Sequence, residues 1–284
     1  MDVDRGELVR RRLEDVAIIR DLHELAPVGG RAAGGRDRRR FEWFAKMRED
    51  FPDRAGLRDE RDQPDVAAAR RARKRKLLPH PRHQPPPDAD SSFRVATYNI
   101  HYGYDTYWHL SLEEQARTIE DSGAGVVMLQ EVDTGRPTSY MIDDAMWLAR
   151  RLDMREVYLP TMEHLTGIAL LSRYPILETD ALLLLSELEQ TGIIWAELDI
   201  GGESINAFAI WMGLEPDERA RQLDAALPFL QAHPGPAAFG GDFNSTPDSP
   251  VYARIESAGF EDPFVALDFG SPPTDPAINP TKRI

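Results

Sequence analysis

The residues best suited to chemistry lie in the stretch Phe239-Gly240-Gly241-Asp242-Phe243-Asn244-Ser245-Thr246-Pro247. A run of small and apolar residues, 237–240, ends there on an acid and an amide. The two glycines let the backbone approach its neighbours, and Pro247 prevents the strand from continuing. An ionised carboxylate at the end of a buried strand is unfavourable unless a cation or a donor group compensates its charge. The stretch therefore predicts a functional site; the alternative is an ordinary Asp/Asn turn that closes a strand.

Two further strands are expected to end in polar groups. Asn99 follows the alternating segment 93–98, and Glu131 follows the continuous apolar run 126–129. Because site residues gather on loops at the ends of strands, we expect both to lie near the acid and amide described above. Two carboxylates and two amides suit Mg²⁺ (or Mn²⁺), which takes one or two protein carboxylates and keeps several waters. Such an ion polarises a phosphoryl oxygen, so the set predicts metal-assisted chemistry on a phosphoryl group.

The elements that must position these residues follow the hydrophobic pattern after residue 92. Strands are expected over 93–98, 126–129, 155–159, 167–171, 181–185, 193–200, 204–212 and 237–240. Helices are expected from a capping box at Ser111 to 119, over 143–152, over 217–232 with Pro228 kinking it or ending it early, and over 251–258. Strands of both patterns mixed with helices indicate packed sheets that are covered by helices on the outside.

Composition limits the possible chemistry. The chain has 284 residues, of which 42% are hydrophobic, and this is enough for one sizeable core. It contains no Cys, which excludes disulfides, thiolate metal sites and cysteine nucleophiles and leaves oxygen or imidazole ligands. No apolar run approaches membrane-spanning length and the N-terminus lacks a signal-peptide pattern, so we expect a cytoplasmic protein.

Charge is divided unevenly along the chain. Residues 1–90 hold 22 Lys/Arg against 18 Asp/Glu, whereas residues 91–284 hold 12 against 30. A domain this acidic repels a long polyanion, so extended duplex DNA is a poor partner for it. A small phosphodiester, or a lipid head group together with a divalent ion, fits the charge better.

Three segments are expected. Residues 1–78 form a basic extension of low hydrophobicity that is largely disordered or helical, 79–92 a Pro-rich linker, and 93–284 the folded domain. The basic run Arg70-Arg71-Ala72-Arg73-Lys74-Arg75-Lys76 predicts an arm that contacts nucleic acid or an anionic surface. The alternatives are a solvated, partly disordered extension and a start site assigned too far upstream.

Four motifs, in order and spacing, resemble those of the endonuclease/exonuclease/phosphatase superfamily, which includes DNase I-like nucleases, inositol-phosphate phosphatases and neutral sphingomyelinases. They are Tyr98-Asn99-Ile100, Leu129-Gln130-Glu131, Gly167-Ile168-Ala169-Leu170-Leu171-Ser172-Arg173-Tyr174-Pro175-Ile176 and Gly241-Asp242-Phe243-Asn244. The likeness covers residues 93–284. A narrower likeness is to the soluble C-terminal domain of membrane proteins that remodel GPI-anchor lipids; it rests on Gly103-Tyr104-Asp105, Asp133, Arg136, Asp143 and the Gly167–Ser172 run.

The resemblance implies a four-layer α/β/β/α sandwich, an α+β fold of the DNase I-like kind, and Mg²⁺-dependent phosphoester hydrolysis. By resemblance, Glu131 holds the metal and Asn99 supports the metal and the phosphate. Asp242 orients or activates the attacking water, and Asn244 stabilises the transition state.

The chain departs from the superfamily pattern at three places. Trp211 stands where the superfamily places a His, and Thr191 where an Arg is common. The end at Ile284 precedes the superfamily's last Asp and its Ser-Asp-His loop, so we expect the final strand or strands to be missing. A general acid or base contributes about 10²–10⁴-fold to rate. The hypotheses are therefore a phosphoesterase of impaired activity, a catalytically dead relic that binds metal or phosphate, and a nucleic-acid-binding protein acting through Arg70–Lys76.

Other side chains are weaker candidates for contact with substrate. His101, Arg136 and Arg173 could meet a phosphate; the alternatives are a solvent-facing His and structural ion pairs. The aromatic loop that contains Asp105 and His109 could form a lip beside the substrate, or it could be an ordinary surface loop.

Overall fold

The computed structural model describes residues 93–266, 268, 270 and 272–284. The predicted basic extension 1–78, with its run Arg70–Lys76, and the predicted linker 79–92 lie outside the described residues. Within the described part of the chain, no helix is both long enough and apolar enough to cross a bilayer.

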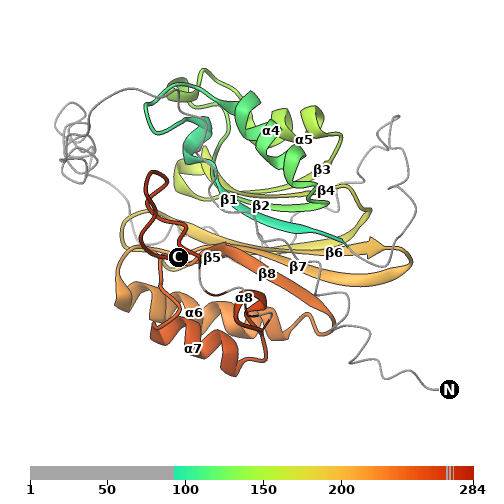
Figure 1. The fold of residues 1–284 in the computed structure, drawn as a ribbon, viewed down its shortest axis with the longest axis vertical. Helices are drawn as coiled ribbons and strands as arrows, with labels where there is room; N and C mark the ends of the chain where they lie inside the picture. Colours follow the sequence, from blue (N-terminus) through green and yellow to red (C-terminus); the bar gives the residue numbers. More distant parts are fainter. Residues whose placement is uncertain (1–92, 267, 269, 271) are drawn as a thin grey trace, which may run out of the picture. The chain divides into compact units, whose positions relative to one another are not determined.

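Two four-stranded sheets lie face to face at the centre of this region (Figure 1). The first has the order β1-β2-β4-β3 and the second the order β5-β6-β7-β8. The pairs β1–β2 and β7–β8 are parallel, and every other neighbouring pair is antiparallel. The strands are β1 (Val95–Asn99), β2 (Val126–Asp133), β3 (Arg155–Pro160), β4 (Thr166–Ser172), β5 (Ile176–Leu184), β6 (Thr191–Ile200), β7 (Glu203–Trp211) and β8 (Ala237–Asp242).

Helices cover the outer faces of both sheets (Figure 1). The first sheet carries α4 (Leu112–Ser122) and α5 (Asp144–Leu152); the second carries α6 (Pro216–Gln231), α7 (Pro250–Ser257) and α8 (Pro263–Ala266). Short 3₁₀ turns are η1 (His101–Gly103), η2 (Pro137–Ser139) and η3 (Met162–His164). The result is the four-layer α/β/β/α arrangement that the resemblance to the superfamily implied.

Three hydrophobic layers hold the four structural layers together. All eight residues of β2 are buried, because this strand is covered on one face by helices and on the other by the second sheet. Its successive side chains point to opposite faces: Val127 and Leu129 pack under the helices, and Val126 and Met128 pack between the sheets. This explains why its first four residues, 126–129, form a continuous apolar run.

The ends of two helices differ from expectation. Ser111 is the N-cap of α4, but its side chain makes no capping hydrogen bond, so the predicted capping box does not form. Pro228 lies inside α6 and does not end it; the helix continues to Gln231. Only one further turn follows Pro228, whose carbonyl still accepts a 3.0 Å hydrogen bond from Ala232 N.

The segment after α8 contains a single isolated bridge, Asp275 to Lys282. No strand follows β8 among the described residues.

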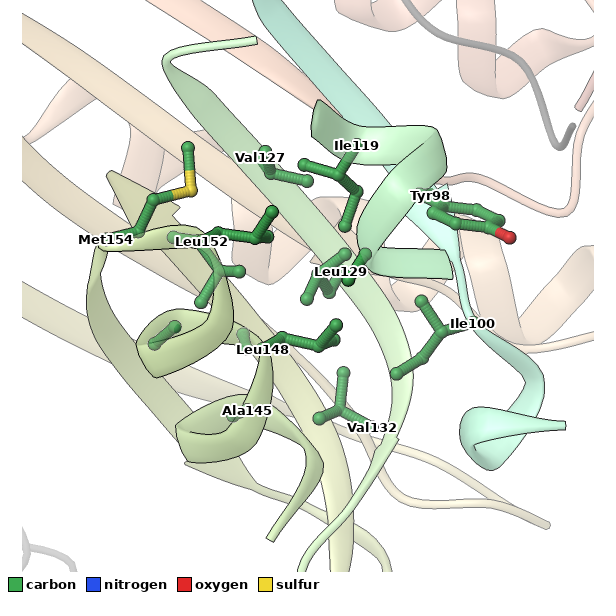
Figure 2. Packing of buried hydrophobic residues seen from close by; sticks show 14 of the residues in the cluster. Tyr98, Ile100, Ile119, Val127, Leu129, Val132, Ala145, Leu148, Leu152 and Met154 are labelled. Carbon is green, nitrogen blue, oxygen red and sulfur yellow. The ribbon is translucent and has the colours of Figure 1, made fainter. Parts of the chain in front are cut away.

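Removing one fully buried side chain beneath α5 should show how much this packing contributes. Figure 2 shows Leu148 directed toward Leu129 and Val132 of β2, and Leu148 is 0% exposed. Leu148→Ala should lower the free energy of unfolding by about 3 kcal/mol, since it leaves a cavity as well as losing apolar burial. The matched control Leu177→Ala, at a position that is 57% exposed, should change it by less than about 0.5 kcal/mol. Urea denaturation measures both, and equal losses would contradict this packing.

Candidate functional site

The C-terminal ends of four strands meet at one edge of the sandwich, called here the site edge. β1 and β2 run parallel, and so do β7 and β8, so each pair ends on the same side of its sheet. Asn99 is the last residue of β1 and Asp242 the last residue of β8, and their side chains are hydrogen-bonded. The ends of the two sheets are therefore brought together at this edge.

The side-chain amide of Asn99 joins two carboxylates. Its Nδ2 donates to Glu131 Oε1 at 3.0 Å and to Asp242 Oδ2 at 3.1 Å. Its Oδ1 accepts a 3.0 Å hydrogen bond from the backbone N of His101. Every polar atom of the amide is thus engaged, and these partners fix which way the amide faces. Asn99 is the link between a carboxylate of the first sheet and a carboxylate of the second.

Asp242 is held from both sides. Its Oδ1 accepts a 3.0 Å hydrogen bond from the backbone N of Asn244, while its Oδ2 accepts from Asn99. Burial and the negative charge of Glu131 together raise the pKa of Asp242 to about 6, against the lowering effect of the hydrogen bond from Asn99. The carboxylate therefore lies where a cation or a bound donor would stabilise its charged form.

Asn244 is fixed in the loop after β8. It adopts a left-handed backbone conformation, with φ 47°, which Asn tolerates better than most residues. Its side-chain Nδ2 donates to the carbonyl of Met212 at 2.8 Å, and Met212 N donates to the carbonyl of Asp242 at 2.9 Å. These bonds hold the loops after β7 and β8 against each other.

Glu131 does not stand at a strand tip as the sequence predicted. β2 continues to Asp133, and its pairing with β4 shifts register between Leu129 and Val132. Glu131 lies inside this bulge with φ 52° and is 5% exposed. A bulge changes the direction of the side chain that it contains. This explains how Glu131, although it lies in a buried strand, directs its carboxylate toward Asn99.

His101 remains at the site edge. Its backbone N contacts Asn99, and its ring lies 4.5 Å from the ring of Trp108 and 5.6 Å from that of Tyr102, centroid to centroid. The aromatic loop after β1 is therefore packed directly beside the site.

The two arginines proposed to bind phosphate lie elsewhere or are already paired. Arg136 contacts Glu163 at 2.9 Å and Asp133 at 3.5 Å, so it belongs to a structural ion-pair network. Arg173 follows Ser172, which pairs with Val126 at the start of β2, so the structure places it at the opposite end of the first sheet.

The two positions that depart from the superfamily pattern have structural partners. Trp211 pairs in register with Asp242, and its side chain is 2% exposed in the layer between the sheets. Thr191 is buried, and its Oγ1 accepts a 3.0 Å hydrogen bond from Gln222 Nε2. Neither side chain supplies a group that titrates near neutral pH.

A buried polar network around Gln222 was not predicted from the sequence. Gln222 Oε1 accepts from Gly213 N at 2.9 Å, and its Nε2 donates to Glu218 Oε1 at 3.3 Å. A side chain at Gly213 would come within 2.4 Å of the Glu218 carboxylate, so glycine is needed there for close approach. The network holds the loop after β7 next to Met212. The i, i+4 spacing of Glu218 and Gln222 on the first turns of α6 was the available signal.

A second unpredicted feature is a pair of buried acids behind the site. Asp133 is 1% exposed and accepts a hydrogen bond from Thr166 Oγ1. Asp144 is fully buried, and burial together with the charge of Asp133 raises the pKa of Asp144 to about 8. At neutral pH Asp144 is therefore largely protonated.

The donor set suits a hard divalent cation that keeps most of its waters. No group of three or more His, Cys, Asp or Glu side chains in the described ranges is placed to hold a metal. Mg²⁺ needs fewer: one or two carboxylates are its usual protein ligands, and Glu131 and Asp242 share one amide donor. The cluster at the site edge therefore fits Mg²⁺ (or Mn²⁺) by its chemistry.

Comparison with known proteins agrees with this architecture. A family described as the PGAP2IP C-terminal nuclease-like domain matches residues 90–262. The chain belongs to this family, and thereby to the endonuclease/exonuclease/phosphatase superfamily.

One curated relative and two solved structures illustrate the likeness. Protein cwh43 of Schizosaccharomyces pombe is 30% identical over 153 residues, which is 52% of this chain but only 16% of that protein. An endonuclease/exonuclease/phosphatase family protein from Leptotrichia buccalis has a TM-score of 0.50 and 19% identity, over 60% of this chain and 76% of that one. An endonuclease/exonuclease/phosphatase from Bacteroides vulgatus has a TM-score of 0.48 and 20% identity, over 57% of this chain and 70% of that one.

The buried acid Asp144 should make the stability of the protein depend on pH. Its pKa is about 8 in the folded state against 3.8 as the ordinary value, so the folded state binds this proton more tightly. The contribution of protonated Asp144 to the free energy of unfolding is fully present below about pH 4. It is lost as pH rises toward 8, at up to about 1.4 kcal/mol per pH unit. Asp144→Asn keeps the shape and cannot ionise, so its stability should fall less between pH 5 and 8.

The measurement is urea denaturation at several pH values in the presence of a chelator. The control is Asp121→Asn, which changes an exposed acid on α4 and should parallel the wild type. If Asp144→Asn also paralleled the wild type, the burial of a protonated Asp144 would be refuted.

Proposed function

We propose that this chain is a divalent-metal-dependent phosphoester hydrolase whose site is the Asn99, Glu131 and Asp242 cluster. One observation carries the proposal: a single amide holds two carboxylates from opposite sheets within 3.0 and 3.1 Å of the same nitrogen. Such a concentration of acids has a physical rationale as a cation site. Membership of the superfamily supports the reaction class.

In this proposal, Glu131 holds Mg²⁺ (or Mn²⁺) and Asn99 keeps the carboxylate facing it. When bound, the ion supplies charge neutralisation and polarises a phosphoryl oxygen. The amide of Asn99 also prevents Glu131 and Asp242 from turning away from each other, because both of its hydrogens are donated to them. The protein thus provides a preorganised pair of carboxylates, which avoids rearrangement during the reaction.

Asp242 orients the attacking water. Each of its two oxygens accepts one hydrogen bond from the protein, from Asn99 and from the backbone N of Asn244. A carboxylate oxygen can accept more than one hydrogen bond, so each retains capacity for a water proton. Asn244 follows in the loop, with its side-chain Nδ2 anchored on the carbonyl of Met212. In this proposal its amide also donates to a phosphoryl oxygen.

A second candidate is a module that binds metal or phosphate without turnover. The observation that favours it is Trp211, which is buried between the sheets beside Asp242 at the position where the superfamily places a His. Indole donates a hydrogen bond but does not titrate, so it cannot serve as a general acid or base.

The substrate class that best fits the domain is a small phosphodiester or a lipid head group. Residues 91–284 hold 12 Lys/Arg against 30 Asp/Glu, which disfavours a long polyanion. The likeness to GPI-anchor-remodelling domains points to the lipid alternative.

Hydrolysis of bis(p-nitrophenyl) phosphate by the full chain tests this function. We expect turnover with Mg²⁺ or Mn²⁺ that is abolished by a chelator. Asp242→Ala and Glu131→Gln should each lower the rate by at least about 10²-fold, whereas the exposed-acid control Asp121→Asn should not. A folded wild type whose rate did not exceed that of Asp242→Ala would refute turnover and leave the binding module as the function.

A further inference from the structure

Exposed apolar side chains are concentrated at the site edge. Of the twelve large apolar residues that are exposed in the described part of the chain, eight lie on loops at this edge. This set, called here the apolar rim, comprises Tyr107, Trp108, Leu110, Tyr140, Met141, Leu185, Leu188 and Leu214. Single exposed apolar residues are ordinary, but their collection on one side of a domain indicates an interaction surface.

Strand pairing shows that these loops share one edge. The loops that carry Trp108 and Tyr140 follow the ends of β1 and β2, next to Asn99. In the second sheet, Leu184 pairs with Thr191, so the loop between β5 and β6 is at the end where β6 begins. That end is the site edge, because Gly192 pairs with Trp211, which in turn pairs with Asp242. The rim therefore has members on both sheets around the same site.

The loop after β1 holds its aromatic side chains out by its own hydrogen bonds. Asp105 Oδ1 accepts from the backbone N of Tyr107 and of His109, at 2.8 Å each. Trp108 is 58% exposed, although one side of its ring packs on His101. These rings are exposed while their backbone is fixed.

The turn after β2 extends the same surface. Tyr104 OH donates to the carbonyl of Thr138, which joins this turn to the aromatic loop. The exposed Tyr140 and Met141 follow directly, and Met141 continues into a shallow groove lined also by Met146. This hydrogen bond links the two loops that carry the apolar rim on the first sheet.

We propose that the apolar rim docks on the surface of a zwitterionic lipid bilayer. Tyr and Trp are the residues that favour the level of the head groups, and Leu and Met side chains enter the boundary of the acyl region. The members lie on separate loops around a site, as expected for residues that insert into the head-group region of a bilayer.

The position of the rim also favours a bilayer over a protein partner. This argument rests on the proposed function: a protein that covered the rim would close the phosphoester site, whereas a lipid surface carries phosphodiesters to it. The negative charge of residues 91–284 disfavours strongly anionic lipids, so the neutral phosphatidylcholine surface is the predicted partner.

Flotation of the full chain with phosphatidylcholine vesicles tests the proposal, in a chelator and without substrate. Leu188→Ser, on the rim, is matched by Leu177→Ser, which replaces the same residue type near the start of β5; the two are 62% and 57% exposed. We expect the vesicle partition coefficient to fall at least about threefold in Leu188→Ser and at least about fivefold in Trp108→Ser. Leu177→Ser should bind as the wild type does. Thermal melting verifies that each variant folds.

The possible outcomes separate this proposal from the proposed function. Absence of wild-type binding to phosphatidylcholine vesicles, or equal binding by all variants, would overturn docking through the rim, whatever the hydrolysis assay shows. Binding confined to phosphatidylserine vesicles would assign attachment to charge and also overturn it. Self-association that Leu188→Ser abolishes, without vesicle binding, would assign the rim to a second copy of the chain instead. Since the assay needs no turnover, an inactive protein can still support docking.

Discussion

The structure of the site depends on one side-chain amide that stands between two carboxylates from different sheets. Asn99 donates to Glu131 within its own sheet and to Asp242 across the sandwich. Two carboxylates in such proximity repel each other, and Glu131 is buried as well, so a shared donor or a cation is needed to hold them in place. The amide supplies the donor, and its remaining oxygen is fixed by His101 N. This interaction fixes the two carboxylates, one from each sheet, in a single polar site.

The rest of the fold keeps the two sheet ends in register. Packing of Val126 and Met128 against the second sheet sets the separation of the layers, and helices on both outer faces bury the remaining apolar surface. At the edge itself, the bulge around Glu131 turns a buried strand residue toward the amide. Gln222 accepts a hydrogen bond from Gly213 N and so holds the loop after β7. Rigid strands therefore position the acids, while the loops around them carry the exposed apolar residues.

Hydrophobic periodicity predicted the strands and helices in their order along the chain and packed sheets covered by helices, because burial on two faces or on one leaves a clear pattern. The four-layer arrangement was implied by the resemblance to the superfamily. Motifs at strand ends predicted that Asn99, Glu131 and Asp242 would lie close together, and their catalytic roles remain predictions. The position of Glu131 within a bulge depends on pairing with β4, which is a non-local property that local sequence does not encode. The same holds for Arg173, because it follows a strand that runs antiparallel to β2 and ends at the opposite edge. Gln222 likewise donates to Thr191, which lies 31 residues away in the sequence.

The most direct test of the shared-amide site is the thermal stability of the full chain with and without Mg²⁺ or Mn²⁺. A ligand that binds only the folded state at 100 times its Kd stabilises it by about 2.7 kcal/mol. The account predicts that saturating metal raises the wild-type melting temperature by several degrees. The rise should be much smaller in Glu131→Gln, and Asn99→Leu should melt lower than the wild type in a chelator. The account would be contradicted if metal left the wild-type melting temperature unchanged, or if it raised that of Glu131→Gln by the same amount.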